Sequence, residues 1–192
     1  MTVEGQKHIA GEVQRAIDNH DAKAVPVLLQ ALELSALEAG ALSEAALDLL
    51  LHAVSSDSVR QPQAWLVLKF LDDNWEFLEG DRKQALLSLV VGAFEQFDDW
   101  MGAFFVPDLV GRRYATTEGL EALRSLSRAT AHVPRSLVPS GIAQFVRQAP
   151  SEDIARDAIS LLRTMNADPV ENVRDEAAKY IEQLSRDGLI GK

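Results

Sequence analysis

The sequence predicts an all-α protein built from antiparallel helix pairs, and three observations point to this class. No segment alternates apolar and polar residues over the length of a β-strand. Apolar residues recur at helical spacing along most of the chain, so that each series forms one stripe down a helix. Residues of the type that cap helix N-termini recur at intervals of 38, 36 and 34 residues: Ser43, Asp81, Thr117 and Ser151.

The recurring caps indicate a repeat of two helices. One such pair cannot bury its own apolar face, whereas stacked pairs can, and this is typical of an α-solenoid. We therefore expect a single helical-repeat domain over residues 1–192, arranged as a right-handed α-solenoid of about five antiparallel helix pairs. A closed helical bundle is the alternative. The expected units are an N-terminal cap pair at about 1–40 and repeats at about 43–78, 81–113, 117–149 and 151–186.

The first two pairs are expected at 3–18 with 22–39, and at 43–55 with 61–78. Gly40 follows the first pair, where a left-handed residue commonly ends a helix. Ser43 precedes Glu44 and is the expected N-cap of the second pair. The second helix of that pair carries a stripe with steps of four and three residues: Ala64, Leu68, Leu71, Trp75 and Leu78.

The last three pairs are expected at 82–97 with 99–113, at 117–131 with 136–149, and at 152–166 with 169–186. Their first helices would begin behind the caps Asp81, Thr117 and Ser151. Pro134 and Pro169 lie where a first helical turn tolerates a missing N–H. The final helix carries the stripe Val170, Val173, Ala177, Ile181 and Leu184.

The last pair, residues 152–186, resembles a HEAT repeat. Its leucine-rich first helix is followed by Asp168 in the turn, then by Val173-Arg174 and Ala177 in the second helix. The resemblance implies that Asp168 and Arg174 support the turn and a hydrogen-bond ladder between repeats. It also implies that the protein binds another macromolecule along a groove formed by its second helices. A few HEAT-like proteins are enzymes, and each of those needs a motif of its own.

Composition excludes several classes of protein. The chain is 47% hydrophobic and 25% charged, so it can build a core, and it has no cysteine for disulfides or thiolate metal sites. Its net charge is −10, which argues against a nucleic-acid coat. All of this charge lies in residues 1–100, with seven basic and seventeen acidic side chains. Residues 101–192 hold twelve of each, and ten of those twelve basic residues are arginine.

Membrane insertion and export are not expected. The most apolar stretch, residues 86–93, is eight residues long, whereas a membrane span needs about 20. Residues 1–18 contain several charges and no apolar run of the kind that signal peptides have. We therefore expect a cytoplasmic protein.

Catalytic and metal-binding motifs are missing from the sequence. The four histidines, His8, His20, His52 and His132, are isolated, and none has a second histidine at helical spacing. Neither a nucleophile elbow nor a glycine-rich phosphate loop is present. We expect a non-enzymatic protein without a metal ion or cofactor.

Two acidic, tryptophan-containing clusters and one group of arginines are the candidate partner-binding residues. The acidic clusters are Asp72-Asp73-Asn74-Trp75 and Asp98-Asp99-Trp100, each near a junction between helices. They would offer contact area and charge to a basic partner. Alternatively, the acids cap helices and the tryptophans pack between repeats. The arginines are Arg112, Arg113, Arg124 and Arg128, which would bind phosphate groups or, alternatively, pair with neighbouring acids.

These observations predict a non-enzymatic protein-binding scaffold whose acidic half attracts a basic partner protein. In its narrowest form the prediction is an inhibitor or immunity-type protein that blocks a basic toxin. One alternative is a HEAT-like nucleic-acid-binding protein or DNA-repair-type enzyme. Another is self-association, in which the acidic half of one chain meets the arginine-bearing half of a second copy.

Overall fold

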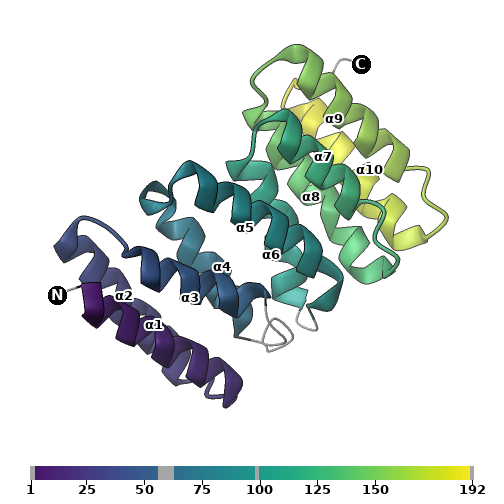
Figure 1. Cartoon of the computed structure of the whole chain (residues 1–192). Helices are drawn as coiled ribbons and strands as arrows, with labels where there is room; N and C mark the ends of the chain where they lie inside the picture. The colour runs from purple at the N-terminus through teal and green to yellow at the C-terminus, as the bar shows by residue number, and fades with distance from the viewer. Residues whose placement is uncertain (1–2, 56–62, 98–99, 191–192) are drawn as a thin grey trace. The chain divides into compact units, whose positions relative to one another are not determined.

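The computed structural model describes residues 3–55, 63–97 and 100–190 (Figure 1). In these ranges the regular secondary structure consists of ten α-helices and two short 3-10 helices, with no strand. The prediction of an all-α protein is therefore confirmed. The chain divides into two compact units, residues 1–102 and 103–192, and each is described by itself. The single domain expected over 1–192 stays a prediction.

Unit 1 contains two helix pairs, α1 with α2 and α3 with α4, followed by α5. α1 packs against α2 and α3, α3 packs against α4 and α5, and α2 packs against α4. The apolar stripes of these helices meet in one core, which includes Ile17, Leu32, Leu50 and Leu68. The elements are α1 (Val3–Asp18), α2 (Ala24–Ala39), α3 (Glu44–Ser55), α4 (Ala64–Asp73), a 3-10 helix (Trp75–Phe77), α5 (Gly80–Ala93) and a second 3-10 helix (Phe94–Gln96).

A buried amide joins the first three helices of unit 1. Gln6 on α1 is 2% exposed. Its Nε2 donates to the carbonyl oxygens of Ser35, at 3.3 Å, and of Ala41, at 3.1 Å. Its Oε1 accepts the backbone N–H of Ser43 at 2.7 Å. One side chain thus satisfies backbone groups at the end of α2 and at the start of α3, which would otherwise be costly to bury.

Unit 2 begins at Ala103, inside α6, and contains two further helix pairs. α8 packs against α7, α9 and α10, and the first helices α7 and α9 also contact each other. α6 and α8 cross closely, because a Cβ atom on Gly141 would lie 2.2 Å from the carbonyl oxygen of Pro107. The elements are α6 (Trp100–Arg113), α7 (Thr117–Leu126), α8 (His132–Gln148), α9 (Glu152–Met165) and α10 (Glu171–Arg186).

Two of the four expected N-caps are confirmed. Ser43 Oγ accepts the N–H of Ala46, and Ser151 Oγ accepts the N–H of Ile154, both at 3.3 Å. Thr117 is not the cap of α7, because the preceding Thr116 has the extended backbone of an N-cap and accepts the N–H of Gly119 at 3.2 Å. Asp81 is not a cap either, because α5 begins one residue earlier and Asp81 lies within its first turn.

The helix lengths differ from prediction at a few ends. Trp75–Phe77 is a separate 3-10 helix behind α4, and Phe94–Gln96 is another behind α5. α7 ends at Leu126 rather than near 131, and α8 begins at His132 rather than 136. Pro134 consequently lies in the first turn of α8, where its missing N–H costs no helical hydrogen bond.

An arginine in the second helix of each pair in unit 2 holds the preceding turn. Arg135 Nη1 donates to the carbonyl oxygens of Ala129 and Thr130, six and five residues earlier. Arg174 Nη1 donates to the carbonyl oxygens of Asp168 and Pro169 with the same two spacings. Each arginine thus donates to two backbone carbonyls of the turn before its own helix, where helix ends need donors from outside the helix. The structural role expected for Arg174 in the turn is confirmed.

No helix within the described ranges is both long and apolar enough to cross a membrane.

Candidate functional site

The first acidic cluster presents less charge than its sequence indicates. Asp72 is 4% exposed and contributes almost no surface. Asp73 is exposed and forms an ion pair with Lys69 one turn earlier. Trp75 is half-buried, and Lys83 Nζ lies 5.1 Å from the centroid of its ring. The part of this cluster that a partner can reach is therefore Asp73 and one side of the indole.

Of the second acidic cluster, only Trp100 belongs to the described residues. Asp98 and Asp99 lie outside them. Trp100, the first residue of α6, is 62% exposed, which is high for a side chain of this size. Trp100 is thus the aromatic residue of the predicted set that offers the most contact area.

The arginines of unit 2 mostly pair with carboxylates of the same unit. Arg112 Nε donates to Asp108 at 2.8 Å, and Arg124 Nη1 donates to Glu121 at 2.5 Å. Arg113 is exposed in the last turn of α6, where a cation is favourable. The interpretation that arginines pair with neighbouring acids is confirmed for these pairs and for four more: Arg135–Asp168, Arg147–Asp187, Arg156–Asp153 and Arg186–Glu182.

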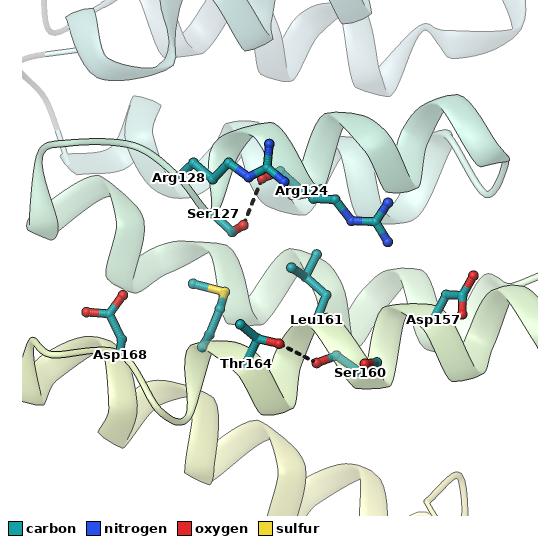
Figure 2. A pocket seen from close by; sticks show the side chains of 9 residues that line it. Arg124, Ser127, Arg128, Asp157, Ser160, Leu161, Thr164 and Asp168 are labelled. Carbon is teal, nitrogen blue, oxygen red and sulfur yellow. Dashed lines mark hydrogen bonds between the residues drawn. The ribbon is translucent and has the colours of Figure 1, made fainter.

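A pocket of about 340 Å³ lies between α7 and α9 (Figure 2). It brings together Arg124 and Arg128, two of the predicted arginines, whereas Arg112 and Arg113 do not line it. The face of α9 that lines the other side of the pocket was not predicted from the sequence. The signal for this face was the helical spacing of Asp157, Leu161 and Thr164. The lining residues are Arg124, Ser127, Arg128, Asp157, Ser160, Leu161, Thr164, Met165 and Asp168.

The chemistry of this pocket is polar but balanced. Ser127 Oγ donates to the carbonyl oxygen of Arg124 at 2.8 Å, and Thr164 Oγ1 donates to that of Ser160 at 3.0 Å (Figure 2). These hydroxyl protons are therefore used within their own helices. Two guanidinium groups face two carboxylates across the lining, so the pocket does not concentrate positive charge for a phosphate group. It also lacks a paired nucleophile and base among its lining residues.

A group of exposed apolar side chains on α2 escaped the sequence analysis. Val27, Leu34 and Leu37 are 64%, 58% and 62% exposed. The signal was the composition of residues 24–39, in which Glu33 and Glu38 are the only charged residues. A helix that is apolar on every side is normally buried, so an exposed one marks a surface of interest. We call Val27, Leu34 and Leu37 the α2 face.

Metal ligands do not converge in the described ranges: no group of three or more His, Cys, Asp or Glu residues there could hold a metal ion.

No protein-family model, curated protein or solved structure matches this chain.

Proposed function

We propose that this chain is a non-enzymatic binding protein, a short HEAT-like solenoid whose acidic N-terminal unit binds a basic partner protein. Its narrowest form is an inhibitor or immunity-type protein that masks a basic toxin or enzyme. The observation that carries the proposal is the uncompensated charge of unit 1, which is described next.

The surplus of acid is confined to one unit. Unit 1 holds seventeen acidic and seven basic side chains, so its own bases can neutralise fewer than half of its acids. Unit 2 holds twelve of each and pairs most of its arginines internally. Clustered charge of one sign steers a partner of opposite sign and raises the association rate. The asymmetry therefore supports a basic protein as the partner of unit 1.

Contacts within the units support the solenoid form of the proposal. First helices follow one another in contact, α1 with α3 and α3 with α5 in unit 1, and α7 with α9 in unit 2. Second helices do the same, α2 with α4 and α8 with α10. Stacking of pair on pair in this manner is what repeat architectures use to bury their apolar faces.

Nucleic-acid binding has less support. Phosphate recognition needs guanidinium groups that are not already neutralised. Two of the four predicted arginines are already paired with a carboxylate on their own helix: Arg112 with Asp108, and Arg124 with Glu121. The acidic surface of unit 1 would also repel a polyanion.

The experiment is affinity capture from the native host at low ionic strength, with nuclease-treated and untreated lysates compared, followed by binding kinetics with the purified partner. We expect a stoichiometric protein that survives nuclease treatment. Its association rate should fall several-fold between low and high salt, because screening shortens the reach of charge from about 10 Å at 0.1 M to about 3 Å at 1 M. A partner that is lost with nuclease, or an association rate independent of salt, contradicts the proposal.

Matched charge variants sharpen this experiment. The test variant Glu4→Gln/Glu44→Gln/Glu76→Gln removes three exposed acids of unit 1. The control Glu152→Gln/Glu171→Gln/Asp175→Asn removes three exposed acids of unit 2. Each set includes two acids from the first turns of α-helices, so the loss of α-helix dipole stabilisation is matched. We expect the test variant to slow association and the control to leave it nearly unchanged. Equal effects of both contradict a role for the acidic unit.

A further inference from the structure

The α2 face is an apolar surface that unit 1 leaves open. α2 packs against α1 and α4 through its opposite side, which buries Val25, Leu29 and Leu32. The described residues contain seven large hydrophobic side chains that are exposed, and three of them are on α2. Of the other four, Val3, Trp100 and Val133 lie on α1, α6 and α8, and Leu189 follows α10. Isolated exposed apolar residues are ordinary, but a concentration on one helix is typical of an interaction site.

The three side chains form one stripe. Val27 and Leu34 are seven positions apart, and Leu37 follows three positions later, so all three lie within about 80° of the helix circumference. The stripe is about 15 Å long, which corresponds to almost three helical turns. Steps of seven and three residues keep apolar side chains on one face of a helix, as in helices that pack along one another.

Acidic residues border the stripe. Glu38 is one turn from Leu34, and Glu33 lies beside the stripe on the flank of Leu37. Both carboxylates belong to exposed residues, and α2 itself carries no basic side chain. Unit 1 as a whole carries ten more acidic than basic side chains. The surface is thus mainly apolar along its centre, where the exposed Gln30 lies between Val27 and Leu34, and it carries carboxylates at its edges.

We propose that the α2 face docks an amphipathic helix of the partner protein, with apolar residues along its centre and Lys or Arg along its borders. This inference rests on the proposed function and names the element of the partner that the acidic unit binds. Basic side chains at the borders would meet Glu33 and Glu38, while apolar side chains cover Leu34 and Leu37.

A second copy of the chain fits this surface poorly. A two-fold contact between two α2 faces would bring the acidic borders of both copies, with Glu33 and Glu38 of each, into one interface. It would also bring together two units that each carry ten excess negative charges. Like charges set against each other across an interface are unfavourable, whereas a basic helix removes the repulsion and adds attraction.

The test uses two synthetic helical peptides as probes, measured by fluorescence anisotropy with the full chain. Both carry leucine at the a and d positions of about three heptads. The remaining positions are mostly lysine in one peptide and mostly glutamate in the other. We expect the lysine peptide to bind and the glutamate peptide not to bind. A lysine peptide that does not bind the unmodified protein overturns the inference.

Variants separate the α2 face from general attraction to an acidic protein. Leu34→Gln/Leu37→Gln should weaken binding of the lysine peptide by about tenfold or more, because both anchors lose apolar contact. Val133→Gln, an exposed valine on α8 in unit 2, is the control and should have no effect. Circular dichroism should show the same helix content in all variants, because the substituted side chains are exposed. Equal binding by Leu34→Gln/Leu37→Gln and the unmodified protein overturns the inference.

The acidic border has its own control. Glu33→Gln/Glu38→Gln and Glu44→Gln/Glu76→Gln change the net charge by the same amount, but only the first pair borders the stripe. We expect Glu33→Gln/Glu38→Gln to weaken binding of the lysine peptide several-fold more than Glu44→Gln/Glu76→Gln does. Equal weakening overturns the inference, since the carboxylates beside the stripe would then have no local contact.

Two further readouts distinguish the remaining outcomes. Light scattering should report a monomer, and a dimer that Leu34→Gln/Leu37→Gln dissociates would overturn the inference in favour of a second copy. The captured native partner separates this inference from the proposed function. If that partner binds with salt dependence but equally to Leu34→Gln/Leu37→Gln, the inference fails and the proposed function stands. If its association is independent of salt, the proposed function fails.

Discussion

Arg135 and Asp168 form an ion pair between successive helix pairs of unit 2, with Nε 3.2 Å from Oδ2 and Nη2 3.3 Å from Oδ1. Arg135 is in the first turn of α8, and Asp168 is in the turn between α9 and α10. Both side chains are mostly buried, at 13% and 15% exposure. Asp168 also accepts the N–H of Val170 at 2.9 Å, so it supports its own turn and ties that turn to the preceding pair. Asp168 thus has the two contacts, with its own turn and with the preceding helix pair, that the resemblance implied for it.

Removing one partner of this pair should be costly. Arg135→Met leaves the Asp168 carboxylate mostly buried without its cation, and we expect a loss of about 3 kcal/mol in the free energy of unfolding. Asp168→Asn in the same chain should recover part of that loss, because the uncompensated charge is gone. Urea denaturation followed by circular dichroism measures both, since all three tryptophans lie in unit 1 and would not report unit 2. Strictly additive losses would contradict an interaction between the two residues.

The crossing of α6 and α8 should tolerate no side chain at Gly141. A Cβ atom there would lie 2.2 Å from the carbonyl oxygen of Pro107, which is backbone and cannot rotate away. We expect Gly141→Ala to destabilise the protein by about 2 kcal/mol or more, measured by the shift of its urea midpoint.

Gly11→Ala is the matched control for that substitution. Gly11 is also inside a helix, α1, but a Cβ atom there has nothing within 4 Å. Alanine is favoured over glycine in a helix interior by about 1 kcal/mol, so this variant should be somewhat more stable than the unmodified protein. If both alanine variants are equally destabilised, the close crossing is not the cause.

The Glu118 carboxylate at the start of α7 should titrate at lower pH than an ordinary glutamate. Its own backbone N–H and the Thr116 side chain form hydrogen bonds that lower the pKa of Glu118 below the usual 4.5. Its contribution to stability is therefore complete above about pH 4.5 and is lost as the pH falls through the lowered pKa. Thr116→Ala should raise the pKa of Glu118 part of the way back, as followed by carboxyl carbon chemical shifts in an NMR titration.

Thr117→Ala provides the comparison for this titration. Thr117 is adjacent and exposed, but Thr116 is the N-cap. The pKa of Glu118 should therefore respond to substitution of Thr116 and not of Thr117. If the pKa of Glu118 changes only in Thr117→Ala, then Thr117 is the N-cap, as the sequence predicted.

Small-angle X-ray scattering tests the proposed solenoid against a closed bundle. A compact globular chain of 192 residues has a radius of gyration of about 16 Å. Helix pairs stacked in a row make a longer particle, so we expect a value clearly above this figure and an asymmetric distance distribution. A value near 16 Å would favour the bundle.

Features that depend on a few neighbouring residues could be predicted from the sequence. Ser43 and Ser151 could be identified as caps because each precedes an acidic first turn. A serine hydroxyl at that position can accept the backbone N–H three residues later without help from distant segments. Where two candidates adjoin, as at Thr116 and Thr117, the pattern cannot choose, because the choice depends on which residue leaves the helical conformation first.

The candidate site was harder to predict, because burial depends on packing between segments. Asp72 lies four residues after Leu68, on the apolar stripe of α4, and its burial could have been inferred from that spacing. The exposure of Leu34 and Leu37 could not, because an apolar helix gives no indication of which side its neighbours cover. The pocket between α7 and α9 could not be predicted either, because it depends on how two separate helices align.

The amide of Gln6 has a consequence for the order of events during synthesis. Its farthest partner, Ser43, is 37 residues later in the chain. At a translation rate of about 5–20 residues per second, α1 leaves the ribosome seconds before that partner does. Until then the Oε1 atom of Gln6 lacks the Ser43 N–H that it accepts in the folded protein, and burying this oxygen without a donor would be unfavourable. The hydrogen bonds of this buried amide are therefore complete only when the start of α3 has emerged and three helices can pack together.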